Sequence, residues 1–320
     1  MDVKKEALEA DKRIRKHIRE TPVEFSPYLS QLGNCQVYLK LENIQISGSF
    51  KLRGAMNKIL SLKNNELKRG IVTASTGNHG AAVAHTLKKF GWKGTIFLPE
   101  NTSQVKIEAF RLYDVDIKFY GNDCLDSELF ARDTAKKNNQ VYISAYNDPK
   151  VIGGQGTIGI ELARQINKID TVLVPVGGGS CISGIAGYLK SVHKNIEMIG
   201  CQPENSAVMY ESIKAGKVID MESKPTISDG TAGGIELDTI TFDICKNYVD
   251  DYILVTEDEI KKAIRLILEK HYMLIEGSAA LQVASFIKAK ERFKNKNVVL
   301  IISGSKIGLD TVKEVLCNGE

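Results

Sequence analysis

Residues 171–189 read TVLVPVGGGSCISGIAGYL, a short apolar run followed by three glycines and a segment with apolar residues at helical spacing. Such a run indicates a buried strand, and Gly177, Gly178 and Gly179 indicate a tight turn that leads directly into a helix. Residues 71–87, IVTASTGNHGAAVAHTL, show the same order of strand, turn and helix. Because strands that alternate with helices usually pair in parallel, the two stretches predict an α/β fold.

The alternation extends over the rest of the chain. Further strands are predicted at residues 37–41, 94–99, 115–120, 197–201, 252–256 and 297–303. Helices are predicted at residues 81–92, 103–113, 127–139, 157–167, 182–194 and 259–271. The opening segment predicts a helix with Ala7, Ile14 and Ile18 on one face that ends near Thr21 and Pro22. The chain has no internal repeat and no Pro/Ser-rich linker, so a second domain must form where the chain crosses over and returns.

Composition argues against several functional classes. The 320 residues are 43% hydrophobic and 26% charged, and the net charge is only +4 with basic and acidic residues intermixed. This pattern does not indicate a nucleic-acid partner. No apolar run is long enough to cross a membrane, and the charged N-terminus lacks the apolar core of a signal peptide. The six cysteines show neither disulfide nor zinc-ligand spacing, so we expect a cytoplasmic protein without a membrane partner.

The two glycine-containing turns predict anion-binding sites. Each places backbone N–H groups at a helix N-terminus, which favours phosphate or carboxylate groups. Neither turn has the Gly-Lys-Ser/Thr ending of a Walker loop, and Ile182 stands where a dinucleotide fingerprint needs glycine. The acidic ribose partner expected about 20 residues later is missing, because the next strand ends in Cys201 and Gln202. Both nucleotide hypotheses therefore fail.

One lysine has the surroundings of a nucleophile. Lys51 lies in SGSFKLRGA, residues 47–55, without acidic neighbours, and a lysine kept away from other charges loses its proton more easily. The chain has no GxSxG or HExxH motif, its histidines are dispersed, and Cys181 is better explained by helix packing than by catalysis. Near the C-terminus a predicted strand leads into Ser303. A lysine, two anion sites and a polar partner for a ring together suit pyridoxal phosphate.

The chain resembles the fold-type II pyridoxal-phosphate enzymes, in the branch of serine/threonine dehydratases and serine racemases. Five stretches carry the resemblance in the family's order and spacing: SGSFKLRGA, STGNHGAAVA, VPVGGGSCISGIA, IEGSAA and IISGS. The resemblance implies the two-domain α/β fold of the tryptophan synthase β type, with parallel-rich twisted sheets flanked by helices. We expect a large cofactor-binding domain of residues 1–46 and 147–320, and a small domain of residues 47–146.

The resemblance also implies roles for individual residues. Lys51 would bind the cofactor aldehyde and later remove the Cα proton of the substrate, and Thr76 and Glu276 are the other catalytic candidates. Phe50 would pack against the cofactor ring, and Asn78 would bind its 3-hydroxyl group. The remaining cofactor contacts would come from Gly177, Gly178, Gly179 and Ser180 at the phosphate and from Ser303 at the ring nitrogen. The substrate carboxylate would be held by Ser75, Thr76, Gly77, Asn78 and His79.

Some of these residues have a plainer explanation. Glu276 could be a structural hydrogen-bond acceptor, and His79 is better suited to orienting its loop than to transferring protons. Ser303 could cap a strand, and Phe50 could belong to the core. Lys306 stands where the family usually has asparagine, and this extra cation could pair with the phosphate, with Glu276 or with an acidic substrate.

Ser303 bears on the type of reaction. A hydroxyl group is too weak an acid to protonate the pyridine nitrogen, so the ring would be a poorer electron sink and β-elimination would be favoured over transamination. We therefore predict the dehydration and deamination of a hydroxy amino acid such as L-threonine or L-serine to a 2-keto acid and ammonia. The alternatives are a serine racemase, a dehydratase for a modified substrate such as 3-hydroxyaspartate and, more distantly, a non-catalytic amino-acid-binding homologue.

Three further expectations follow from the resemblance. Racemases carry serine at the position of Thr76, so a threonine hydroxyl could serve as the second acid or base. Residues 202–208 contain only one carboxylate, Glu204, so we expect no metal site there. The chain stops shortly after IISGS, so we expect no regulatory C-terminal domain, and we expect a homodimer, which is common in the family.

Overall fold

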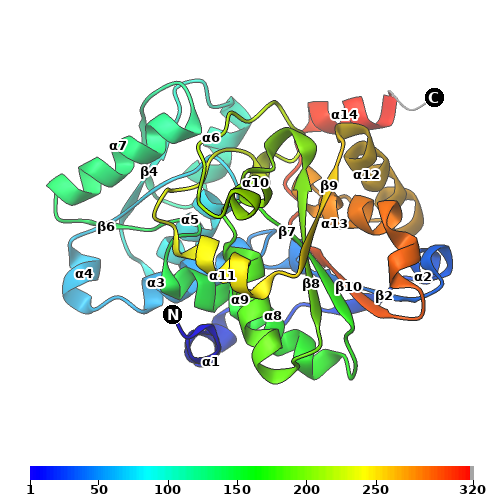
Figure 1. Ribbon diagram of the computed structural model, residues 1–320. Helices are drawn as coiled ribbons and strands as arrows, with labels where there is room; N and C mark the ends of the chain where they lie inside the picture. The colour runs from blue at the N-terminus through cyan, green and yellow to red at the C-terminus, as the bar shows by residue number, and fades with distance from the viewer. Residues whose placement is uncertain (318–320) are drawn as a thin grey trace.

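The computed structural model describes residues 1–317 and contains two β-sheets that lie side by side (Figure 1). The first sheet has six strands, all parallel except its edge strand β1: in order β1 (Val23–Phe25), β2 (Gln36–Leu41), β10 (Asn297–Ile302), β7 (Thr171–Pro175), β8 (Glu197–Pro203) and β9 (Asp251–Val255). The second sheet has four parallel strands: in order β5 (Asp116–Phe119), β4 (Gly94–Leu98), β3 (Ile71–Ala74) and β6 (Val141–Tyr142).

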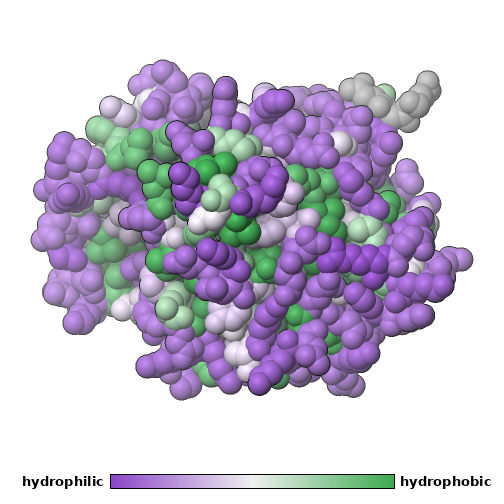
Figure 2. Space-filling model, in the orientation of Figure 1, coloured by the Kyte–Doolittle hydropathy of each residue, from purple (hydrophilic) through white to green (hydrophobic). Residues whose placement is uncertain are grey.

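Helices cover both faces of the first sheet. One face packs on α2 (Pro27–Gly33), α12 (Glu257–His271) and α13 (Gly277–Lys288), and the other packs on α8 (Pro149–Gln165), α9 (Ser180–Val192) and α11 (Ile240–Tyr248). Each side has its own cluster of buried aliphatic side chains, which is the arrangement that parallel sheets require. Hydrophilic residues cover most of the molecular face in Figure 2, and hydrophobic residues gather there in small patches.

The second sheet also packs against helices. Its neighbours include α3 (Lys51–Leu60), α5 (Asn78–Phe90), α6 (Gln104–Arg111) and α7 (Cys124–Lys137). Ile14, from helix α1 (Val3–Ile14), packs with Leu52 and Met56 of α3 in the same cluster, although we assign residues 1–46 to the large domain. Residues 1–46 therefore contact both predicted domains, and the domain boundaries stay a prediction. The remaining helices are α4 (Asn64–Lys68), α10 (Val208–Ala215) and α14 (Leu309–Cys317).

The strand predictions agree well with this fold. All eight predicted strands are present, and the two strands that were not predicted, β1 and β6, have only three and two residues. The opening helix is shorter than expected, because α1 ends at Ile14 and a 3₁₀ turn follows, although Ile18 remains buried. Seven helices were not predicted: α2, α3, which begins at Lys51, α4, α10, α11, α13 and α14. None of the helices within residues 1–317 combines the length and the apolar character needed to cross a membrane.

A buried group of charges joins the N-terminal segment to α3 and α8. The Arg53 guanidinium donates to Glu42 Oε2 at 2.7 Å and to Glu161 Oε1 at 2.7 Å, and all three side chains are fully buried. Lys40 Nζ donates to Glu161 Oε2 at 2.5 Å, and Thr21 Oγ1 donates to Glu42 Oε1 at 2.5 Å. Burial alone would raise the pKa of Glu161, but Arg53 and Lys40 lower it to about 2. The group is therefore ionised and multiply hydrogen-bonded, as a buried charge cluster must be.

Arg53→Ala is expected to lower the free energy of unfolding by about 3–5 kcal/mol, because it leaves two buried carboxylates without their shared cation. Urea unfolding followed by circular dichroism measures this loss. Arg69→Ala is the matched control, since Arg69 pairs with Glu66 at the surface and its loss is expected to cost less than about 1 kcal/mol. Equal effects of the two substitutions would contradict a central role for Arg53.

Candidate active site

Three strand ends and the segment before α3 bring the predicted residues together. Ser303 follows β10, the Gly177–Gly179 turn follows β7, and the Ser75–Gly77 loop follows β3. Ligands in parallel α/β sheets bind beyond the carboxyl ends of the strands, which is where these turns lie. Ser49 forms an antiparallel bridge with Gly304, so the lysine segment is attached directly to the end of β10.

Lys51 is the first residue of α3 and faces into this region. The backbone N–H of Phe50 donates to Ser303 O at 3.1 Å, and this bond fixes the start of the helix. Lys51 Nζ donates to Ala145 O at 3.0 Å and lies 5.3 Å from the centroid of the Phe50 ring. Burial lowers the pKa of Lys51 to about 8, because the charged ammonium loses its hydration. About a tenth of this amine is therefore neutral and nucleophilic at pH 7, far more than of an ordinary lysine.

Asn78 and Glu276 join the two sheets across the site. Asn78 begins α5 and its Nδ2 donates to both carboxylate oxygens of Glu276, at 3.0 and 2.9 Å. Glu276 lies just before α13 and also accepts from the backbone N–H of Lys306 at 3.1 Å. Burial raises the pKa of Glu276 to about 7, although the hydrogen bond from Asn78 opposes the shift. Glu276 can therefore gain or lose a proton near neutral pH.

The glycine turn after β7 leaves no space for side chains. A Cβ atom at Gly177 would lie 2.9 Å from Thr231 Cα, and one at Gly178 would collide with the ring of Tyr146. Gly179 has a φ of +82°, in the left-handed region that favours glycine. The turn leads into α9, whose N-terminus begins at the buried Ser180. Backbone N–H groups at such a helix N-terminus can hold a phosphate group.

Two buried polar atoms test whether these residues fit pyridoxal phosphate. Within residues 1–317, Ser303 Oγ and Asn78 Oδ1 are both buried and have no hydrogen-bond partner. Most buried polar atoms in native proteins are hydrogen-bonded, and a missing ligand is one explanation for an unpartnered atom. A pyridine nitrogen and a phenolic hydroxyl group are the partners that these two atoms need. Together with the glycine turn and Lys51, they make the residues of this site fit the cofactor.

The loop predicted to hold the substrate carboxylate lies at the N-terminus of α5. Gly77 N–H donates to Ser75 Oγ at 3.2 Å, which shapes the loop, and Thr76 is partly buried within it. His79 is buried and its Nε2 is bonded to Ile143 O at 3.0 Å. Burial and the nearby Lys51 lower the pKa of His79 to about 3, so the ring is neutral. This geometry agrees with a histidine that orients its loop.

Tyr146 and Ala145 are site residues that the sequence analysis did not identify. Both follow β6, which was missed because it has only two residues. The rule that sites form at the carboxyl ends of parallel strands would have identified them if β6 had been recognised. Cys181 was expected to pack within its helix, and it is buried in α9 with a pKa raised by burial.

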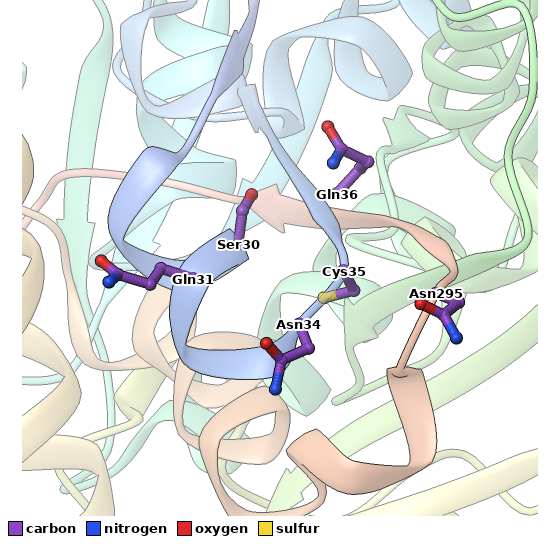
Figure 3. Close-up of a pocket in the computed structure, with 6 residues that line it drawn as sticks. All are labelled: Ser30, Gln31, Asn34, Cys35, Gln36 and Asn295. Carbon is purple, nitrogen blue, oxygen red and sulfur yellow. The ribbon is translucent and has the colours of Figure 1, made fainter.

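One hollow elsewhere on the protein carries no comparable chemistry. Six residues line a hollow of about 600 Å³, and Figure 3 draws their side chains: Ser30, Gln31, Asn34, Cys35, Gln36 and Asn295. Gln36 begins β2 and Asn295 precedes β10, so this hollow lies at the opposite end of the strands from Lys51. Across residues 1–317, no three His, Cys, Asp or Glu side chains are grouped to hold a metal ion.

Comparisons with known proteins agree with this site. Residues 14–304 match the family described as "Pyridoxal-phosphate dependent enzyme". The catabolic L-threonine dehydratase of Staphylococcus aureus (strain USA300) is 39% identical over 315 residues, which cover 97% of this chain and 91% of the relative.

Solved structures support the same family. The processed form of threonine deaminase isoform 2 from Solanum lycopersicum is 32% identical with a TM-score of 0.94, covering 98% of this chain and 87% of that one. Maize serine racemase is 30% identical with a TM-score of 0.91, covering 98% of this chain and 97% of that one. The predicted fold class and resemblance are confirmed: the chain belongs to the pyridoxal-phosphate-dependent enzymes of fold type II, in the branch of threonine dehydratases and serine racemases, and its cofactor is pyridoxal phosphate.

Proposed function

We propose that the chain is an ammonia-lyase that removes water and ammonia from a β-hydroxy amino acid, with L-threonine or L-serine as substrate. The observation that carries this proposal is the buried hydroxyl of Ser303, which has no partner within residues 1–317 and whose backbone carbonyl accepts from the N–H of Phe50, the residue before Lys51. The similarity to threonine dehydratases over nearly the whole chain supports the same reaction.

Lys51 would bind the cofactor aldehyde and then act as the base of the reaction. Pyridoxal phosphate supplies an aldehyde for the substrate amine and a ring that withdraws electrons from Cα. The neutral amine of Lys51 removes the Cα proton, and the low pKa of this amine makes it available as a base. The Ala145 carbonyl, which accepts from Nζ at 3.0 Å, orients the amine when it is free.

The remaining side chains hold the substrate and balance the protons. The N–H groups at the start of α5, with Ser75, Thr76 and Asn78, would bind the substrate carboxylate. The substrate hydroxyl leaves as water and therefore takes up one proton. Glu276, with a pKa of about 7, is the group best suited to exchange a proton near neutral pH. The enamine released after elimination is hydrolysed to the 2-keto acid and ammonia.

Ser303 favours β-elimination over transamination, which needs a longer-lived negative charge at Cα. A serine hydroxyl donates a hydrogen bond to a ring nitrogen but cannot transfer its proton, so negative charge at Cα is poorly stabilised. Expulsion of the β-hydroxyl removes that charge at once. An aspartate at the same position would stabilise the charge and give transamination time to compete.

Racemisation of serine is the second candidate function. It is favoured by Thr76, whose hydroxyl lies in the loop predicted to hold the substrate carboxylate, and by the similarity to maize serine racemase. An acidic substrate such as 3-hydroxyaspartate would need a cation near its side chain. Lys306 is the candidate, because its backbone N–H bonds to Glu276. Chiral analysis of the recovered amino acid and trials with acidic substrates separate these candidates from dehydration.

We also propose a cytoplasmic homodimer. All six cysteines are free thiols, which suits a reducing compartment. Phe25, Tyr28 and Tyr272 expose 45%, 39% and 90% of their surface, and the bond between Ser26 and His271 holds their two segments together. Such exposed aromatic side chains are typical of protein interfaces. Light scattering of the purified protein measures its mass and would show a monomer if the proposal is wrong.

The direct test is the near-visible absorption of the purified protein before and after addition of L-threonine or L-serine. We expect a cofactor band that changes with substrate, together with release of a 2-keto acid. Lys51→Ala is expected to reduce keto-acid release on the order of a thousandfold, because it removes both the nucleophile and the base. A substrate-dependent band without keto acid would contradict the dehydratase proposal, and no band after addition of pyridoxal phosphate would contradict any enzyme of this type.

The rate at which the apoprotein captures pyridoxal phosphate should depend on pH through Lys51. Only the neutral amine attacks the aldehyde, so the rate is expected to reach half its maximum near pH 8 and to level off roughly one pH unit higher. A free lysine derivative, whose ammonium has its usual pKa near 10.4, serves as the control because its rate keeps rising well beyond that pH. Stopped-flow absorbance gives both profiles, and a protein profile that matches the control would contradict the lowered pKa.

Ser303→Asp is expected to change the balance between reactions. A carboxylate beside the ring nitrogen holds a proton there, so keto-acid release should fall roughly tenfold, about 1.4 kcal/mol in activation free energy. The slow loss of the cofactor aldehyde to transamination should rise at the same time. Ser303→Ala is the control, because it removes the hydroxyl without adding an acid. Elimination at the wild-type rate in Ser303→Asp would show that residue 303 does not control the protonation of the ring nitrogen.

A further inference from the structure

Residues 144–147 contact both the nucleophile and the phosphate turn. This segment connects β6 to α8, and its Ala145 carbonyl accepts from Lys51 Nζ at 3.0 Å. The ring of the next residue, Tyr146, fills the space that a side chain at Gly178 would occupy. A shift of this segment would therefore move the lysine contact and the wall of the phosphate site together.

A second segment, residues 231–240, lies over the same turn. It begins at Thr231, whose Cα lies 2.9 Å from the position of a Cβ at Gly177. It ends at Ile240, the first residue of α11, whose N–H donates to Asn147 Oδ1 at 3.0 Å. Glu236 lies between these two contacts.

Glu236 connects this second segment to Tyr146, Asn147 and α7. Its carboxylate accepts from Asn147 Nδ2 at 2.7 Å, and its backbone N–H donates to the hydroxyl of Tyr146 at 2.9 Å. Arg132 of α7 binds both carboxylate oxygens of Glu236, with Nη1 at 2.8 Å from Oε2. One residue therefore holds the two consecutive residues that follow Ala145.

The surroundings of Glu236 suit a fixed, ionised carboxylate. Its side chain is only 18% exposed, and Arg132 is itself held by Glu128 and lies 4.9 Å from the Tyr142 ring centroid. Burial alone would raise the pKa of Glu236, but the hydrogen bonds from Arg132 and Asn147 lower it. Bidentate pairs between arginine and a carboxylate are among the strongest and most directional of protein hydrogen bonds.

We infer that Glu236 is a positioning residue for the cofactor site. By binding Asn147 and Tyr146, it holds the Tyr146 ring against Gly178 and the Ala145 carbonyl beside Lys51, and Arg132 fixes Glu236 in turn. The inference rests on the proposed function only in assuming that pyridoxal phosphate occupies this site. It concerns the binding of the cofactor and needs no particular substrate.

The test is the dissociation constant of pyridoxal phosphate from the apoprotein, measured by absorbance or fluorescence titration. Glu236→Gln keeps the shape of the side chain but loses the charge that Arg132 binds, so we expect the constant to rise about tenfold. Arg132→Gln should have a similar effect. The double variant should be no worse than the single ones, because both remove the same interaction.

Glu211→Gln is the matched control, because Glu211 forms a surface pair with Lys214 on α10 and should bind the cofactor as the wild type does. Tyr146→Phe removes only the hydroxyl that accepts from Glu236 and should weaken binding about threefold, which keeps the test open if Glu236→Gln folds poorly. Thermal unfolding is measured in parallel. A lower melting temperature with unchanged cofactor affinity would overturn the inference and leave Glu236 a purely structural ion pair.

Keto-acid release by the wild-type protein is recorded separately. Its absence would contradict the proposed dehydratase reaction without affecting the inference, because cofactor affinity is measured without substrate. Normal keto-acid release together with wild-type affinity in Glu236→Gln and Tyr146→Phe would overturn the inference alone.

Discussion

The position of Lys51 depends on the buried pairing of Arg53 with Glu42 and Glu161. Arg53 follows the lysine by two residues in α3, so any displacement of the guanidinium moves the start of the helix that carries the nucleophile. A buried guanidinium is costly to desolvate and keeps its place only where several acceptors meet it in the right geometry. Here two carboxylates, Thr21 and Thr157 surround it, from segments that are far apart in the sequence. This pairing therefore places the lysine with an accuracy that aliphatic packing alone would not provide.

Much of the fold could be predicted because its signals are local. Most of the eight longer strands contain a short run of apolar residues, and the two glycine turns lie where a strand meets a helix. The short strands β1 and β6 have no periodicity that a sequence pattern could detect, since each has three residues or fewer. Helix α3 was missed because two serines, a glycine and an aromatic residue directly precede it, and its position depends on the distant partners of Arg53. Tertiary contacts override local preference there.

The site residues also fall into two groups, those that a short motif reveals and those that only a distant contact defines. Lys51, Asn78, the glycine turn and Ser303 belong to short motifs, and the structure brings all of them together, although their individual roles stay proposals. Tyr146 and Glu236 could not be found in this manner, because each is defined by a partner about 30 or 90 residues away in the chain. Nothing in the stretch AYNDP or GGIELD distinguishes them from ordinary loop residues. Their importance follows only from what they contact.

Burial has opposite consequences for the charged groups in this protein, and the difference lies in their partners. Glu161 and Arg53 are buried together and stay ionised, because each compensates the other's lost hydration. Lys51 and Glu276 are buried where opposite charges compensate them only in part, so burial moves the pKa of the lysine down to about 8 and that of the glutamate up to about 7. The two values approach each other near neutral pH, which is the condition under which one group can accept a proton while the other supplies one. Paired charges thus hold the scaffold in place, and partly compensated charges at its centre are left free to exchange protons.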